Sequence, residues 1–72
     1  MKKVFKMQDL DCAHCAAKME KAISKIDGVN AVSINFLMQK ITIEAEDNVF
    51  EEVLEKAQKA VKKVEPDCKI VF

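Results

Sequence analysis

Apolar and polar positions alternate in four segments of the chain, the pattern of strands with one buried face. The four segments are residues 3–8, 29–36, 40–45 and 68–72. Phe5 and Met7 share a face of the first strand, while Cys68, Ile70 and Phe72 share a face of the last. Because only three residues separate the second segment from the third, these two strands are expected to form a hairpin.

Between the first two strands, apolar residues recur at steps of three and four, which predicts an amphipathic helix over residues 15–26. Its apolar stripe consists of Ala16, Met19, Ile23 and Ile26. The sole glycine of the chain, Gly28, follows at the place expected for a left-handed helix cap.

A second helix is predicted between the hairpin and the last strand. Asn48 and Glu51, three residues apart, have the form of a capping box at its start, and Pro66 stops it. The apolar stripe of this helix consists of Phe50, Leu54, Ala57, Val61 and Val64.

The predicted order is therefore β-α-β-β-α-β, in two halves of similar length. Neither half buries its apolar face alone, whereas a four-stranded antiparallel sheet with both helices on one face buries all the stripes together. This is the α+β class, as a ferredoxin-like α/β plait. With 72 residues, the chain has material for one core, and we expect a single domain over residues 1–72.

Composition and charge exclude several function classes. Twelve lysines balance twelve acidic residues and arginine is absent, which argues against a nucleic-acid partner. No apolar run is long enough for a signal peptide or a membrane span, so no direct membrane insertion is expected. Three cysteines are an odd number and do not form a disulfide framework, which favours a reducing, cytoplasmic setting.

Candidate chemistry is concentrated at Cys12 and Cys15, a C-x-x-C pair where the first loop enters the first helix. The free amides and the dipole of a first helical turn favour a thiolate at Cys15, and Cys12 shares that field. Two thiolates suit Cu(I), Zn(II), Cd(II) or Hg(II) and not Mg(II) or Ca(II). A closed structural zinc site needs four ligands, so this pair predicts an open site that exchanges its ion.

Three further residues are candidate ligands. Asp11 adds a hard carboxylate donor, which suits a divalent ion such as Zn(II), whereas the softer Cu(I) and Hg(II) gain little from it; Asp11 also fits as a helix cap. Cys68 begins the last strand, beside the end of the first, and is a candidate additional ligand; core packing explains it equally. We rank His14 below Cys68, because a residue inside the C-x-x-C bend points outward.

The stretch Leu10-Asp11-Cys12-x-x-Cys15-Ala16-Ala17-Lys18, with Gly28-Val29 and the hairpin after it, resembles a heavy-metal-associated domain. The form with Asp before the first Cys is similar to the N-terminal domains of zinc-, cadmium- and lead-exporting P-type ATPases. The resemblance implies that Cys12, Cys15 and Asp11 bind the metal and that Leu10 takes a buried position beneath the loop. Asp9 departs from the family, which has glycine there.

By this resemblance, the domain is a non-enzymatic module that binds Zn(II), Cd(II) or Pb(II) and delivers it to a heavy-metal ATPase, or regulates that pump. It would act in cis, as the N-terminal cytoplasmic domain, or in trans, as a separate carrier. The alternatives are a Cu(I) metallochaperone or copper ATPase domain and, from another class, a dithiol oxidoreductase. We expect a monomer, with a metal-bridged dimer through Cys12 and Cys15 as the other arrangement.

Overall fold

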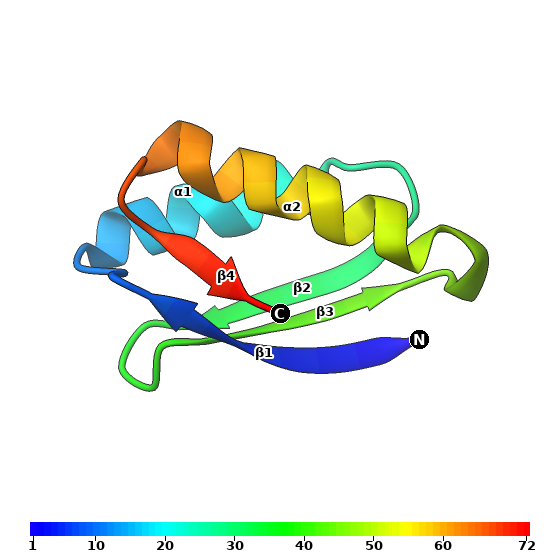
Figure 1. Cartoon of the computed structure of the whole chain (residues 1–72), viewed down its shortest axis with the longest axis horizontal. Helices are drawn as coiled ribbons and strands as arrows, with labels where there is room; N and C mark the ends of the chain where they lie inside the picture. The colour runs from blue at the N-terminus through cyan, green and yellow to red at the C-terminus, as the bar shows by residue number, and fades with distance from the viewer.

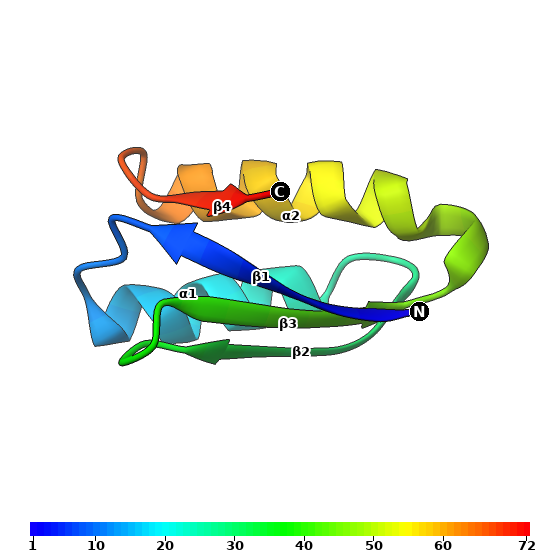
Figure 2. The ribbon, with the colours of Figure 1, turned by 60° about the horizontal axis from the view of Figure 1, so that its bottom comes forward.

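The alternating segments pair into one antiparallel sheet, and both helices cover the same face of it (Figure 1 and Figure 2). The computed structural model describes residues 1–72. The elements are β1 (Lys2–Gln8), α1 (Ala13–Ser24), β2 (Val29–Asn35), β3 (Lys40–Ala45), a 3₁₀ turn η1 (Asp47–Val49), α2 (Phe50–Val64) and β4 (Lys69–Val71). The predicted β-α-β-β-α-β order and ferredoxin-like arrangement are confirmed.

The strand order is β2-β3-β1-β4, so β1 is central and pairs with both β3 and β4. Gln8 at the end of β1 lies opposite Lys69 at the start of β4. This register places the segment after β1 beside the segment before β4, although about sixty residues separate them along the chain. Cys68, one residue before Lys69, therefore lies near the first loop, as expected.

The core lies between the sheet and the two helices. Alternate residues of the strands and every third or fourth residue of the helices point into it, as the two periodicities require. The buried side chains are Met7, Leu10, Ala16, Met19, Ile23, Ile41, Ile43, Ala45, Phe50, Val53, Ala57, Val61, Cys68 and Ile70. Val53 was not assigned to the stripe of α2; the neighbouring Leu54, which was, is only half-buried.

The first helix begins and ends two residues earlier than predicted. It starts at Ala13 because Cys12 caps it, and it ends at Ser24. Ile26 lies beyond it in a tight turn, where its N–H donates to the carbonyl of Ile23 (3.0 Å) and its side chain still packs against the core. The apolar spacing therefore extends past the end of the helix, because a residue in the following turn can also point into the core. This is why the helix was predicted to end too late.

Gly28 is not the helix cap that was predicted. The cap residue of α1 is Lys25, in a right-handed conformation, and Gly28 stands three residues further on, at the entrance to β2. Its φ is +97°, which only glycine adopts readily. A Cβ there would also lie 2.8 Å from Cγ2 of Val49, so close packing against the 3₁₀ turn demands glycine as well.

The predicted capping box at Asn48 and Glu51 is wrong. Asn48 lies inside the 3₁₀ turn, and α2 begins at Phe50, after Val49, which makes no side-chain cap bond. The turn is held by its neighbours instead: the N-terminal ammonium of Met1 forms an ion pair with Asp47 (2.7 Å). A capping residue needs an extended backbone, which a residue within a turn does not have.

Phe72 was expected on the buried face of the last strand but is 62% exposed. It follows the last residue of β4 and meets Phe5 edge-to-face, with ring centroids 5.3 Å apart. The alternation therefore predicted a burial that the end of the strand does not have, since Phe72 packs on Phe5 and otherwise faces solvent.

Side chains from the helices occupy both edges of the sheet. Gln58 of α2 pairs with Ile70 of β4, accepting from its N–H (2.8 Å) and donating to its carbonyl (2.9 Å). At the other edge, a carboxylate oxygen of Glu20 accepts from the N–H of Ile34 in β2 (3.0 Å). These contacts satisfy strand groups that would otherwise be free to pair with another chain.

Candidate metal site

Three connections meet at one end of the molecule: the loop from β1 to α1, the β2–β3 turn and the loop from α2 to β4 (Figure 1 and Figure 2). The first carries Cys12 and the last leads into Cys68. Antiparallel pairing of β1 with β3 and β4 brings them together, because it sets the end of β1 beside the start of both neighbours. All three cysteines are free thiols.

Cys12 is the residue that caps α1. Its backbone is extended (φ −131°, ψ 119°), and its sulfur accepts a hydrogen bond from the N–H of Cys15 (3.3 Å), the place that a serine or aspartate oxygen usually takes. The carbonyl of Cys12 accepts from the N–H of Ala16 (3.0 Å). The C-x-x-C spacing thus equals the spacing between a cap residue and the third residue of its helix, and it sets both sulfurs at the helix start.

The two thiols of the pair are not equivalent. The Cys15 N–H donates to the sulfur of Cys12, and the Cys15 thiol and this N–H together hold the pKa of Cys12 below its ordinary value. The neighbouring sulfur of Cys12 raises the pKa of Cys15, and partial burial raises it further. Cys12 is therefore the first thiolate, and Cys15 is the thiol that would lose its proton when an ion binds.

The side chains of Asp11 and His14 are both exposed and do not complete a ligand set with the thiols. No three His, Cys, Asp or Glu side chains in the structure stand together in a way that could hold one ion. His14 instead acts through its backbone, whose N–H also helps to lower the pKa of Cys12. Of the five candidate ligands, Cys12 and Cys15 are the pair joined by a side-chain hydrogen bond, from the Cys15 N–H to the Cys12 sulfur (3.3 Å).

Cys68 is fully buried, with 0% of its surface exposed, and belongs to the hydrophobic core. Burial is the main cause of its raised pKa, followed by the negative charges of Glu65, Asp9 and Asp11. The core interpretation accounts for this position. The charges also show that Cys68 lies within electrostatic reach of the loop.

Glu65 is a charge that the sequence reasoning did not assign to the site. It follows the last residue of α2, and its negative charge contributes to the raised pKa of Cys15 and Cys68 and opposes the lowering of the pKa of Cys12. Asp67, two residues further along the loop, is not among the causes of any of these shifts. The signal that could have identified Glu65 is its place just before Pro66, where the helix must end and turn toward β4.

The backbone conformation of Asp9 is one that suits glycine better than aspartate. Its φ is 61°, in the left-handed region, where the chain turns out of β1 toward the cysteines. Aspartate tolerates this conformation better than most residues but still at a cost in free energy. The departure from the family pattern is thus a strained residue at the entrance to the loop.

We expect Asp9→Gly to raise the free energy of unfolding by about 0.5 kcal/mol, since relief of ~1–2 kcal/mol of left-handed strain exceeds the ~0.4–1 kcal/mol that a freer unfolded chain costs. Urea denaturation measures this change. Asp9→Asn is the control, because it removes the charge but keeps the tolerance for this backbone, and it should change stability less. A clear loss of stability in Asp9→Gly would contradict the strain argument.

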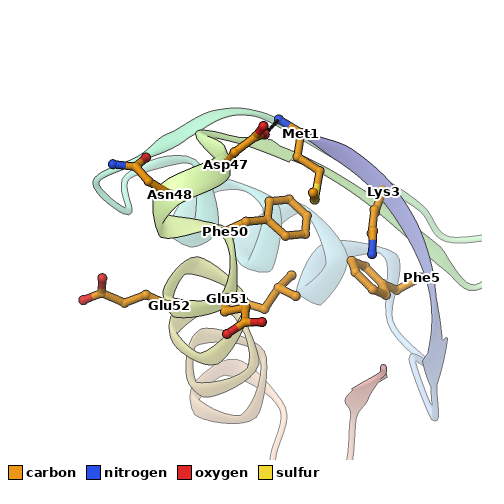
Figure 3. Close-up of a pocket in the computed structure, with 9 residues that line it drawn as sticks. Met1, Lys3, Phe5, Asp47, Asn48, Phe50, Glu51 and Glu52 are labelled. Carbon is orange, nitrogen blue, oxygen red and sulfur yellow. Dashed lines mark ion pairs between the residues drawn. The ribbon is translucent and has the colours of Figure 1, made fainter.

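The largest hollow of the surface lies away from the cysteines, between the first half of β1 and the start of α2 (Figure 3). Phe50 and Phe5 line it with Leu54, and the Met1–Asp47 ion pair closes one side. It contains no cysteine or histidine. Its only sulfur is the thioether of Met1, and no thiolate or imidazole joins it, so the metal-site candidates stay at the other end of the sheet.

The model of the family described as "Heavy-metal-associated domain" matches residues 4–67. Among curated proteins, the chain is 32% identical over 66 residues to a cadmium, zinc and cobalt-transporting ATPase of Bacillus subtilis, and 36% identical over 56 residues to a zinc/cadmium/lead-transporting P-type ATPase of Escherichia coli. The alignments cover 92% and 78% of this chain. They cover only 9% and 8% of those two proteins.

Among solved structures, the chain resembles the N-terminal domain of a potential copper-translocating P-type ATPase from Bacillus subtilis, determined in the Cu(I)-loaded state. The TM-score is 0.76 at 30% identity, and the match covers 96% of this chain and 84% of that one. The sequence relatives thus carry names that mention divalent ions, while this structural relative carries copper.

Proposed function

Because this chain belongs to the heavy-metal-associated domain family, we propose that Cys12 and Cys15 bind a divalent Zn(II), Cd(II) or Pb(II) ion in the cytoplasm, with Asp11 as the third ligand. The domain then passes the ion to a metal-transporting P-type ATPase, or regulates it. It does so as the N-terminal part of such a pump, in accord with its match to about a tenth of the length of these relatives, or as a separate carrier. In either case, it is a binding module and not the catalytic unit.

The observation that carries this proposal is the cap geometry, in which the Cys15 N–H donates to the sulfur of Cys12 (3.3 Å) at the start of α1, with the exposed carboxylate of Asp11 one residue before it. The pKa of Cys12 is lowered and that of Cys15 is raised by this arrangement. Asp11, one residue before Cys12, is exposed and has no hydrogen bond or ion pair to hold its side chain. A rotation of that side chain is therefore inexpensive, and it would add an oxygen donor that a divalent ion accepts.

Transfer follows from an open ligand set. An ion held by two sulfurs and one oxygen has a vacant position that a donor of the partner protein can occupy. The partner donor enters as one ligand of this site leaves, so no bare ion is released into water. Cys15, whose pKa is raised, is the natural leaving ligand because its thiolate most readily takes back a proton.

Cu(I) is the second candidate, and one structural observation favours it. Only two thiols meet in this arrangement, without a third side chain, and two sulfurs satisfy Cu(I). The structural likeness to a Cu(I)-loaded domain also favours Cu(I). Asp11 decides between the two, because only the divalent ions gain from its carboxylate.

The test is Asp11→Asn, which removes the charge and keeps the shape of the side chain. We expect Zn(II) and Cd(II) affinity to fall about 10- to 100-fold, the range seen when an important group around a metal is lost, while Cu(I) affinity changes less than threefold. Anaerobic competition titrations with each ion measure both. Asp67→Asn is a matched control, since this exposed carboxylate shifts none of the thiol pKa values.

If zinc and cadmium affinities were untouched in Asp11→Asn, the divalent proposal would lose its main support and Cu(I) would take its place. Cys68→Ala in the same titrations tests the additional ligand predicted from the sequence. An unchanged affinity would leave Cys68 as a core residue, and a loss comparable to that of Asp11→Asn would add it to the ligand set. Gel filtration with and without the ion distinguishes the monomer from a metal-bridged dimer.

A further inference from the structure

We infer that Gln39, in the β2–β3 turn, is a positioning residue for the metal-binding loop: its carboxamide clamps the peptide of Leu10 and thereby sets the direction in which the chain enters Asp11 and Cys12. The inference rests on the proposed function for its effect on metal binding. Gln39 is distant from the cysteines in sequence, and no motif of the chain includes it.

The contact is two-sided. The N–H of Leu10 donates to Oε1 of Gln39 (3.0 Å), and Nε2 of Gln39 donates to the carbonyl of Leu10 (2.6 Å). The same nitrogen also donates to the carbonyl of Phe36 at the start of the turn (3.0 Å). One amide group thus joins the loop and the turn, which are 29 residues apart at Leu10 and Gln39.

No other hydrogen bond holds the middle of the loop, where only the buried side chain of Leu10 also anchors the chain. Before it, the ladder between β1 and β4 ends at Gln8 and Lys69; after it, the helix bonds begin at Cys12. Leu10 lies between these two anchors with its side chain 2% exposed, and its N–H and carbonyl have no partner except Gln39. Without the carboxamide, two backbone groups beside the core would be left unsatisfied unless the loop opened to water.

The backbone geometry indicates that this clamp holds a strained arrangement. The two non-glycine residues with positive φ are Asp9 (61°) and Gln39 (54°), and they lie on the two sides of the contact. The N–H of Met7 donates to the carbonyl of Gln39 (2.8 Å), which fixes the turn against β1 as well. Left-handed residues persist only where the surrounding structure holds them. Here the hydrogen bonds between Gln39 and Leu10, the residue after Asp9, connect the two left-handed residues.

The consequence for the site follows from the spacing. Leu10 is one residue before Asp11 and two before Cys12, so a change in its peptide plane moves both predicted ligands relative to Cys15, which the helix fixes. A metal site requires its donors to be held within a fraction of an ångström, and groups that orient the ligands matter nearly as much as the ligands. Gln39 has this orienting role without contacting the ion.

Gln39→Asn tests the inference. Asparagine keeps an amide and tolerates the left-handed backbone, but its side chain is one methylene shorter and cannot reach Leu10. We expect about tenfold weaker Zn(II) binding in competition titrations, within the range of outer-shell mutations, and at least tenfold faster hydrogen exchange at the Leu10 amide measured by NMR without metal.

Gln58→Asn is the matched control, because Gln58 makes the same two-sided contact to Ile70 at the sheet edge, outside the loop. It should lose comparable stability in urea but keep Zn(II) affinity within twofold and Leu10 exchange unchanged. Equal losses of affinity in the two variants, or none in Gln39→Asn, would overturn the inference. If the wild-type protein bound no Zn(II), the proposed function would fail for that ion, and Leu10 exchange alone would decide whether Gln39 is a clamp.

Discussion

Cys12→Ser is expected to weaken Zn(II) and Cd(II) binding by more than about a hundredfold, since loss of a ligand costs more than loss of an outer-shell group, which costs 10- to 100-fold. Serine supplies a hydroxyl that does not ionise near neutral pH and is a poor donor for a soft or borderline ion. The affinity is measured by the same competition titrations as for Asp11→Asn.

This substitution separates metal binding from folding, because Cys12 has two roles. Its sulfur caps α1 by accepting the N–H of Cys15, and serine is one of the preferred residues for that role. We therefore expect the free energy of unfolding without metal to be unchanged or slightly higher. A fall in affinity together with intact stability would assign the sulfur to the ion.

His14→Ala is the control inside the same motif. Its imidazole is exposed, and the residue contributes to Cys12 through its backbone N–H, which alanine retains. Affinity within twofold of the wild type is expected. A loss as large as that of Cys12→Ser would make His14 a ligand, contrary to its ranking here, and full binding by Cys12→Ser would remove the proposed site altogether.

Gly28→Ala is expected to lower the free energy of unfolding by about 2–4 kcal/mol, the sum of overpacking and of a residue forced into a left-handed backbone. The new Cβ would lie 2.8 Å from Cγ2 of Val49 and 3.3 Å from Cγ2 of Val53, at a φ of +97°. For a domain of 72 residues, with a total stability of roughly 4–11 kcal/mol, this is a large fraction. Urea denaturation of the metal-free protein measures this loss.

The steric and backbone parts of this loss can be distinguished with Val49→Ala. Val49 is half-buried in the 3₁₀ turn, and truncating it removes the atom nearest to the new Cβ. In the double variant we expect about half of the loss to be recovered, beyond the additive effect of the two substitutions. A Gly28→Ala protein as stable as the wild type would mean that β2 can enter the sheet by another path.

The exchange mechanism gives the two thiols separate roles. If the proposed exchange holds, Cys12, whose pKa is lowered, would receive the ion first, and Cys15, whose pKa is raised, would take up a proton as the ion leaves. The carboxylates of Glu65, Asp9 and Asp11 add negative charge around the loop, as their common effect on Cys68 shows. Such a rim attracts cations and is weakened by salt.

The sequence by itself determined the architecture and the motif. Strand alternation and the three-to-four spacing of Ala16, Met19 and Ile23 are local consequences of backbone geometry, so they could be read before any contact was known. The C-x-x-C spacing was also sufficient to predict that Cys12 and Cys15 lie close together, because a cap residue and the third residue of its helix are neighbours in space. The sequence predicted the ends of the elements less well. The capping box at Asn48, the helix end near Gly28 and the burial of Phe72 were wrong.

Only the tertiary structure decided which distant groups act on the site. Antiparallel pairing placed Cys68 and Glu65 within electrostatic reach of the thiols, and the β2–β3 turn brought the Gln39 amide to Leu10. A glutamine has no signature that distinguishes an exposed position from a clamp on a loop 29 residues away. That distinction depends on where two backbones meet, and the meeting point is set by the register of the whole sheet.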